Sequence, residues 1–391
     1  MKAKMATYLW AAIPLLAAFG LGQQARAAEN NKRVEVYGFV QMDAIYDFNR
    51  SDPSWTAALR PSKIPVNCPG DPGCGRDGET TLSVRQSRVG FNGFVPTEAG
   101  ELKTKFEFDM FGVGPDAGKT TIRLRHAYGE LGQFLAGQTN SLFMDGDVFP
   151  NTIEYWGPTG MIFFRNVQAR WTFLNQGGTK VAVALEAPGS AIDAGQTVTI
   201  DPNLNVNSWN KYPDITGQFR RDAAWGHFQV AGILRSLGYD TPNSTVSGSK
   251  NGWGVNLSGA YKTTGKDQVL AQLAYGEGIA NYFNDGGVDL APSSPTGGAE
   301  TLPILGFLLY YDKYWNDKWS SSFGYSFTDQ SNSGGQTATA YKKGQYGSVN
   351  LLYYPVKNVT VGGEFITGKL EQNGGATGQD NRLQFSAKFS F

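Results

Sequence analysis

The stretch Arg382-Leu-Gln-Phe-Ser-Ala-Lys-Phe-Ser-Phe391 decides the fold. In an extended backbone, neighbouring side chains point to opposite faces. One face of this stretch is apolar and carries Leu383, Phe385, Ala387, Phe389 and Phe391. A membrane-spanning β-barrel needs this alternation, because its strands meet lipid outside and water inside. The stretch therefore predicts the last strand of a transmembrane barrel, paired with the first strand to close the cylinder.

The same alternation recurs along the rest of the chain and predicts an all-β fold. The sixteen predicted strands lie near 34–48, 82–96, 102–112, 121–131, 133–140, 163–173, 179–187, 214–222, 226–237, 251–263, 267–280, 302–312, 318–329, 341–355, 358–371 and 382–391. Short connections such as Pro96–Gly100 alternate with long ones such as 188–213. This two-sided pattern is typical of an antiparallel barrel with short periplasmic turns and long extracellular loops, and soluble sandwiches give no reason for it. Sixteen strands also predict an open aqueous channel.

The N-terminus predicts export. Lys2 and Lys4 precede an apolar run from Leu9 to Leu21, and Ala25-Arg26-Ala27 fits a cleavage site. About thirteen apolar residues are too few to span a bilayer, which needs about 20. We therefore expect a signal peptide over 1–27 and one barrel domain over 28–391, located in the outer membrane of a Gram-negative cell.

Charge and cysteine usage limit the other possibilities. The chain has 34 basic and 34 acidic residues, so net charge alone says nothing about partners. Its two cysteines, Cys68 and Cys74, enclose a turn-rich spacer, and in an oxidising compartment this predicts a disulfide within a loop. A two-thiol metal site would need further cysteine or histidine ligands nearby.

Strand parity places several basic side chains on the inner face of the predicted barrel. The inward set is Arg88, Arg123, Arg125, Arg170, Arg220, Arg235, Lys103, Lys105 and Lys388. A charge that faces hydrocarbon at the midplane costs roughly 2–4 kcal/mol, so these side chains belong in the lumen. Arg85, Arg165 and Arg221 have the opposite parity and are left out of this set. Either the inward arginines pair with inward carboxylates and stiffen the wall, or they form an electropositive channel wall; their clustering favours the second reading.

The connection 141–162 is too apolar for a freely solvated loop. Its notable side chains are Phe143, Asp145, Asp147, Phe149, Glu154, Tyr155 and Trp156. We expect this third long loop to fold into the barrel and narrow the channel. Packing over the rim or at a subunit contact is the alternative.

Several segments resemble one family, the DcaP-like outer-membrane porins. These segments are Tyr37–Phe48, Arg85–Phe91, Leu124–Glu130, Ala136–Gln138 and the 140–162 loop with Glu154-Tyr-Trp-Gly-Pro158. The resemblance implies a sixteen-stranded homotrimeric channel for small anions, notably dicarboxylates, with Arg88, Arg123, Arg125 and Arg170 near the constriction. The chain also ends like many bacterial outer-membrane proteins, whose terminal Phe, here Phe391, is read by the barrel-assembly machinery. Some family members carry an N-terminal coiled coil, whereas here only Ala28 to Arg33 precede the first predicted strand. A trimer would then rest on contacts between barrel walls.

Signals for other functions are weak. The two histidines, His126 with lipid-side parity and His227 beside a turn, suggest no catalytic triad. The sequence shows no ligand spacing for a metal or cofactor and no nucleic-acid motif. We therefore predict a diffusion channel rather than an enzyme, with small anionic solutes, membrane lipid and lipopolysaccharide as its partners. The alternatives are a sugar-preferring or general porin, an outer-membrane barrel enzyme, or a loop receptor for phage or adhesion that coexists with transport.

Overall fold

The structure, a computed structural model, describes residues 32–68, 70 and 74–391. Residues 32–391 form one compact unit. The predicted signal peptide, 1–27, lies outside the described residues and stays a prediction. Among the residues described, none of the helices has the length and apolar character needed to cross a membrane.

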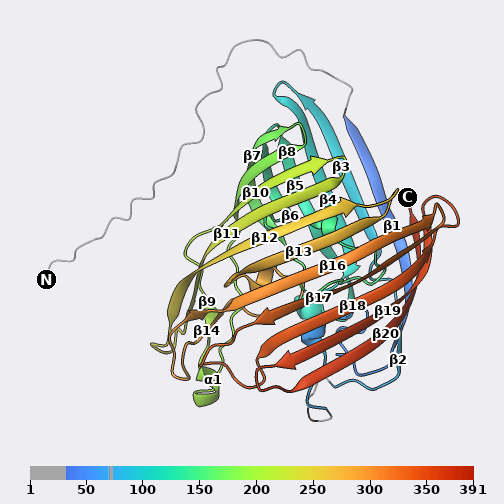
Figure 1. The fold of residues 1–391 in the computed structure, drawn as a ribbon. Coiled ribbons are helices and arrows are strands. Elements are labelled where there is room, and N and C mark those ends of the chain that lie inside the picture. Colours follow the sequence, from blue (N-terminus) through green and yellow to red (C-terminus); the bar gives the residue numbers. More distant parts are fainter. Residues whose placement is uncertain (1–31, 69, 71–73) are drawn as a thin grey trace. The chain divides into compact units, whose positions relative to one another are not determined.

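The compact unit is a closed antiparallel barrel of sixteen strands, as the sequence predicted (Figure 1). Two short segments, β2 and β3, together form the second wall strand. The wall elements are β1 (Arg33–Asp47), β2 (Glu79–Ser83), β3 (Arg88–Thr97), β4 (Gly100–Phe111), β5 (Thr120–Leu131), β6 (Phe134–Asn140), β7 (Arg165–Gln176), β8 (Thr179–Glu186), β10 (Asp214–Ala223), β11 (Gly226–Asp240), β12 (Gly248–Lys262), β13 (Gln268–Glu277), β16 (Pro303–Asn316), β17 (Trp319–Gln330), β18 (Tyr341–Tyr353), β19 (Val359–Gln372) and β20 (Thr377–Ser390).

The cylinder closes between its first and last strands. β20 pairs antiparallel with β1 from Phe39↔Ser390 to Asp47↔Arg382. On its other edge β1 pairs with β3 and then with β2. Every edge of the wall is therefore paired, which removes the exposed backbone donors and acceptors that a membrane cannot satisfy.

Burial confirms the inside-out alternation of the wall. In β17, Phe323 and Tyr325 are exposed on the outside, whereas Ser322 and Ser326 are fully buried inside. The terminal stretch follows the same rule, with Phe385 and Phe389 exposed and Gln384 buried. Large apolar residues thus face lipid, and polar residues face the interior.

Two irregularities change the parity that a regular strand would have. The second wall strand is interrupted at residues 84–87, between β2 and β3. The register of β4 and β5 shifts between Glu107↔His126 and Phe108↔Leu124, which is a β-bulge at Arg125. Side chains beside these irregularities therefore cannot be assigned to a face by counting.

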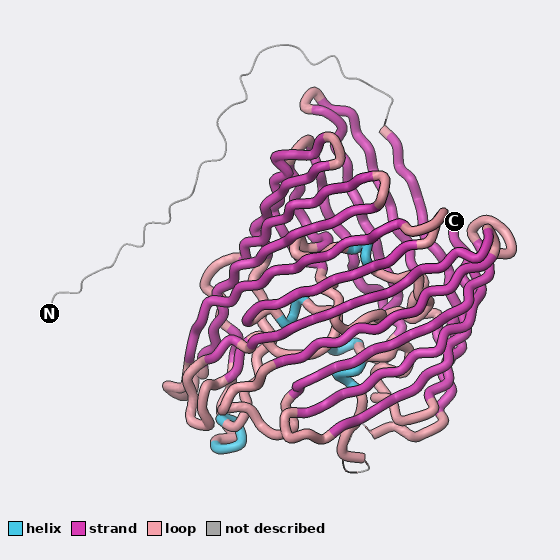
Figure 2. Tube along the Cα trace, in the orientation of Figure 1, coloured by secondary structure: helices cyan, strands magenta, loops and turns pink. Residues whose placement is uncertain are grey.

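The connections differ in length at the two ends of the barrel, as expected, and three long loops matter for the lumen. We name them L1 (48–78), L3 (141–164) and L6 (278–302). Figure 2 shows the short helical turns within these loops and their neighbours. The minor elements are η1 (Pro61–Lys63), η2 (Gly114–Asp116), η3 (Gly146–Val148), η4 (Ala280–Tyr282), α1 (Thr197–Ile200), β9 (Asn207–Ser208), β14 (Leu290–Ala291) and β15 (Glu300–Thr301).

The disulfide between Cys68 and Cys74 is present in L1, which confirms the prediction from the sequence. It closes a loop with a sequence separation of 6.

Candidate functional site

L3 crosses the lumen, as the sequence predicted. Its apex is held through both backbone polar groups of Ile153. The Ile153 amide donates to Glu364 Oε2 at 2.7 Å, and the Ile153 carbonyl accepts from Gln86 at 3.0 Å and Gln384 at 3.1 Å. These partners come from β19, the β2–β3 interruption and β20. The apex is therefore clamped between opposite edges of the closure region.

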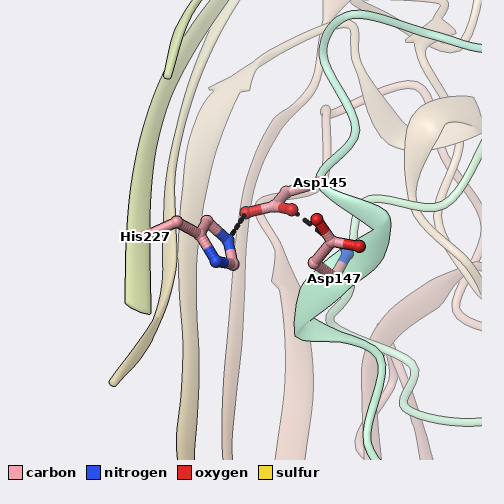
Figure 3. Close-up of side chains that lie close together, drawn as sticks. All are labelled: Asp145, Asp147 and His227. Carbon is pink, nitrogen blue, oxygen red and sulfur yellow. Dashed lines mark hydrogen bonds and ion pairs between the residues drawn. The ribbon is translucent and has the colours of Figure 1, made fainter. Parts of the chain in front are cut away.

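The first half of L3 is anchored by Asp145 to the wall (Figure 3). The buried Asp145 carboxylate accepts hydrogen bonds from His227 and Ser258, both at 2.8 Å, and forms an ion pair with Arg220 at 3.2 Å. Burial raises the pKa of Asp145, but the His227 hydrogen bond and the neighbouring charges lower it more, so the net pKa lies below its ordinary value. Asp145 therefore remains ionised as the anchor.

Asp147 extends the same cluster. Its carboxylate contacts the Arg220 guanidinium at 2.7 Å but is largely exposed. Ligand atoms of Asp145, Asp147 and His227 lie within 4.8 Å of one another, as close as in a metal site. Here the Arg220 guanidinium supplies the positive charge between the two carboxylates, so the cluster is explained as an anchor for L3. Phe143, just before it, is fully buried against Tyr282.

The second half of L3 is tied to L1 and L6. The Glu154 carboxylate accepts from the backbone amides of Leu59 in L1 at 2.9 Å and of Gly157 at 2.6 Å. Complete burial raises the pKa of Glu154 above its ordinary value. The Trp156 indole donates to the carbonyl of Asn284 in L6 at 2.7 Å. Three loops thus meet at one side of the lumen.

L1 also folds inward, which the sequence analysis did not foresee. Trp55, Ala57, Ala58 and Leu59 are buried, and Leu59 packs against interior residues of β18 and β19. The many Gly, Pro and polar residues of 49–81 are typical of an external connection between strands, so the composition predicts no inward fold. The run Trp55-Thr-Ala-Ala-Leu59 was the local signal that could have indicated burial.

A cavity of about 910 Å³ remains between these loops and the sector of the wall that runs from β18–β20 through β1 to β7. Phe149, Tyr155 and Trp156 of L3 line one side of it. Its basic lining residues are Arg60, Arg88, Arg123, Arg125, Arg165 and Lys388, whereas its acidic lining residues are Glu154 and Asp285. The charged residues of the cavity lining are therefore predominantly cationic, and several aromatic rings lie among them.

Two of the arginines that the sequence placed in the lumen are neutralised by carboxylates. Arg123 contacts Asp109 at 2.7 Å, and Arg125 contacts Glu107 at 2.7 Å and Asp109 at 2.9 Å. Arg88 lies farther from Glu107, at 3.6 Å. Three guanidinium groups thus share two carboxylates, which leaves an excess positive charge.

Arg165 and Lys388 face the cavity without an ion-pair partner among the described residues. The Arg165 guanidinium lies 5.2 Å from the Phe163 ring, and the Lys388 ammonium lies 5.0 Å from the Phe39 ring. Arg165 begins β7 directly after L3, so the loop sets the direction of its side chain. Parity counting, which left Arg165 out, fails there for this reason.

The strand interruption has a similar effect on Arg85. Its side chain is buried, donates to the carbonyl of Gly112 at 3.0 Å and lies 4.0 Å from the Phe111 ring. Arg221, the third residue of opposite parity, bonds Gly177 O and Thr179 Oγ1 at a short turn.

The remaining predicted residues lie outside the cavity lining. The Arg235 side chain is fully buried between Asp214 at 3.0 Å and Asp289 at 3.1 Å, where it ties L6 to the wall. Arg170 donates to the carbonyl of Asn140 at 2.6 Å. Lys105 approaches Glu107 at 3.9 Å, and Lys103 lies one inward position farther along β4.

The lipid-side parity expected for His126 is wrong. Its ring accepts or donates a hydrogen bond with Thr139 at 3.0 Å and lies 3.9 Å from the Glu107 carboxylate inside the barrel. The bulge at Arg125 is the cause, because an extra residue in β5 moves its neighbour to the other face.

A closed sixteen-stranded wall with a loop folded across its lumen defines a class, the outer-membrane porins. The chain belongs to the DcaP outer membrane protein family, whose sequence model matches residues 22–391. The protein is therefore an outer-membrane channel, and its relatives are channels rather than enzymes, as the sequence analysis predicted. No curated protein sequence matches the chain.

Solved structures agree with this assignment at the level of the fold. The outer membrane channel DcaP of Acinetobacter baumannii matches with a TM-score of 0.78 and 21% identity, covering 95% of this chain and 99% of that one. An anion-selective porin from Comamonas acidovorans matches with a TM-score of 0.59 and 12% identity, covering 92% and 100%. A trimer form of OmpT from Vibrio cholerae matches with a TM-score of 0.55 and 12% identity, covering 93% and 100%.

Proposed function

We propose that the protein is an anion-selective diffusion channel that admits small organic anions, dicarboxylates above all. The observation that carries the proposal is the imbalance of charge around the cavity, with six basic lining residues against two acidic ones. Both acidic residues are already engaged: Glu154 accepts backbone amides, and Asp285 is paired with Arg60. The cavity thus offers positive charge to a passing solute.

The mechanism follows from this arrangement. A low-dielectric cavity lined by one sign of charge concentrates counter-ions, so anions are enriched at the constriction. Guanidinium groups bind carboxylates through paired hydrogen bonds. A dicarboxylate then moves through the channel from one basic group to the neighbouring one. The affinity for the solute must stay low enough for the solute to leave, and the open, water-accessible cavity keeps this affinity low.

The arrangement of the chain in the membrane is part of the proposal. Short turns would face the periplasm and the long loops the outside, with lipid and lipopolysaccharide around the apolar wall. A homotrimer is proposed because a related fold has been solved as a trimer, and its interface would be the barrel wall. The mass of the detergent-solubilised protein, corrected for bound detergent, tests this assembly, and a monomer would contradict it.

Reversal potentials in planar bilayers test the selectivity. The wild type should prefer chloride over potassium in a KCl gradient, and Arg165→Gln should shift the potential toward potassium, because Arg165 has no carboxylate partner to unmask. The matched control is Arg33→Gln, whose exposed guanidinium pairs with Glu35 at 3.0 Å away from the cavity. Cation preference in the wild type would reject the proposal and favour a general or sugar-preferring porin.

A double variant tests the paired arginines. Arg123→Gln with Arg125→Gln should shift the potential further than Arg165→Gln does, because Asp109 and Glu107 would lose their partners and become exposed negative charge. An unchanged potential would mean that these guanidinium groups are silent in conduction.

A further inference from the structure

Arg60 in L1 is a cavity residue that strand periodicity could not find. It immediately precedes η1 and lines the cavity on the side formed by L1, L3 and L6. Its Nε donates to Asp285 Oδ1 at 2.8 Å. The same carboxylate accepts from the Ser62 amide at 2.8 Å and the Ser62 hydroxyl at 2.6 Å. Asp285 is therefore fixed in place and holds one edge of the guanidinium.

Two indole rings hold the faces of the same group. The Arg60 Cζ lies 4.2 Å from the ring centroid of Trp55 and 4.2 Å from that of Trp156. The two rings are nearly perpendicular, at 81°, so the guanidinium sits in the corner between them. Cation–π contacts of this kind stabilise the charged group and limit its rotation.

The free edge of the guanidinium faces the cavity. Of the hydrogen bonds formed by the residues described, only one uses the Arg60 side chain, and it uses Nε. Both terminal nitrogens thus keep their donors for a solute. Arg123 differs, because its Nε and Nη2 both donate to Asp109. Arg60 is therefore charged and oriented with both terminal nitrogens unbonded, whereas Arg123, which lines the same cavity, already has Nε and one terminal nitrogen bonded to Asp109.

We propose that Arg60 is a capture residue of the channel, binding a solute carboxylate through its two terminal nitrogens alongside the wall arginines of the same cavity. This inference rests on the proposed function and names one residue that sets its solute preference. Because the side chain is already ordered, binding loses little rotamer freedom. The planar fork matches a carboxylate in two parallel hydrogen bonds.

Current block by succinate, added on the long-loop side during single-channel recording in KCl, tests the inference. Arg60→Gln should lower the association rate of succinate about tenfold, the loss expected for one charge-assisted bidentate contact. The matched control is Lys63→Gln, which removes a neighbouring exposed cation of η1 and should leave the association rate unchanged. Equal rates in wild type and Arg60→Gln would overturn the inference.

Two further variants separate recognition from charge. Arg60→Lys keeps the charge but lacks the fork, so its association rate should fall below that of the wild type; a wild-type rate would show that charge alone suffices and would overturn the bidentate contact. Asp285→Asn adds net positive charge but loosens Arg60, so succinate association should fall. A rise in that variant would also overturn the inference.

The outcomes for Arg60 and for the proposed function remain distinguishable. Anion preference of the wild type is read from the reversal potential in KCl alone, and five other basic residues around the cavity support it without Arg60. A cation-selective wild type would reject the proposed function. Wild-type anion preference with no effect of Arg60→Gln on succinate would reject the capture role alone. Heat-modified gel migration confirms that each variant has folded.

Discussion

At the scale of single residues, the buried charged side chains of the lumen fall into two groups that differ in their contacts. Arg220 and Arg235 form ion pairs that attach the loops L3 and L6 to the barrel wall. Arg165 and Arg60 keep donors directed at the cavity. A buried charge that loses its partner lowers the stability of the fold, so Arg220 and Arg235 should matter for stability. Arg165 and Arg60 should matter for conduction.

Asp145→Asn should weaken the anchor of L3 and lower stability by on the order of 3 kcal/mol, because Arg220 and His227 lose a buried carboxylate. Chemical unfolding of the barrel in detergent, followed by intrinsic fluorescence at pH 6, measures this loss. Asp222→Asn is the matched control, since its carboxylate is half exposed and pairs with the same Arg220. An Asp145→Asn midpoint equal to that of the control would contradict the anchor.

The stability difference between the wild type and Asp145→Asn should depend on pH. The pKa of Asp145 lies below its ordinary value of about 4, since the contacts with His227, Ser258 and Arg220 outweigh burial. Such a group contributes stability above its unfolded value, and that contribution disappears as pH falls through the folded value. The stability difference between wild type and Asp145→Asn should therefore be constant from pH 5 to 7 and shrink below about pH 4. A difference that grows on acidification would contradict this assignment.

At the scale of elements, L3 is fixed by close approach as well as by charge. The Gly160 amide donates to Ser326 at 2.7 Å, and its carbonyl accepts from Gln272 at 3.1 Å. A Cβ at this position would lie 2.2 Å from the carbonyl oxygen of Phe327 and 2.3 Å from that of Phe307. Only glycine lets the loop backbone lie directly on the wall there.

Gly160→Ala should push L3 off β16 and β17 and into the lumen, and single-channel conductance should fall. Gly146→Ala in the same loop is the matched control, because its nearest Cβ contact would be an ordinary 3.4 Å to Met144. If folded Gly160→Ala has the same single-channel conductance as the wild type, the wall strands and not L3 have moved to accommodate the added methyl group.

The sequence predicted the elements better than the site. Alternation located the wall strands and apolar content located L3, because lipid and water impose both patterns locally. Arg165, His126 and the inward turn of L1 depend on a loop exit, a bulge and contacts between distant loops, which no local period encodes. Parity assigned Arg88, Arg123 and Arg125 to the lumen, and the structure places all three in the cavity lining. It could not foresee that Asp109 and Glu107 neutralise part of their charge.

At the scale of the whole molecule, the barrel reverses the usual distribution of polarity. Its buried residues include many Ser, Asn and Gln side chains, while its exposed surface carries Phe, Leu, Val and Trp. Stability therefore rests on a continuous ring of strand pairing, on the polar network that holds the loops inside, and on the apolar clusters where the loops pack on the inner wall, while lipid covers the outer face.

Phe323→Arg should lower the stability of the barrel in bilayers by about 2–4 kcal/mol, because Phe323 lies on the lipid face of β17. Phe323→Leu, which stays apolar, should cost much less. Urea unfolding in lipid vesicles measures both. A Phe323→Arg barrel as stable as the wild type would place this face in contact with water or with a polar partner.

The position of L3 makes the passage eccentric, since the loop packs on β11–β13 and β16–β19 and leaves the opening beside the sector from β20 through β1 to β7. A solute thus meets one sector of the wall and mainly the three loops L1, L3 and L6, and the far side of the cylinder serves as scaffold. Retargeting such a channel to a new nutrient requires exchanging a handful of side chains in one sector. The loops 187–213 and 331–340 contribute no residue to the cavity lining, although they bond each other through Gln336 and Asp193, so substitutions at their exposed positions leave the passage unchanged.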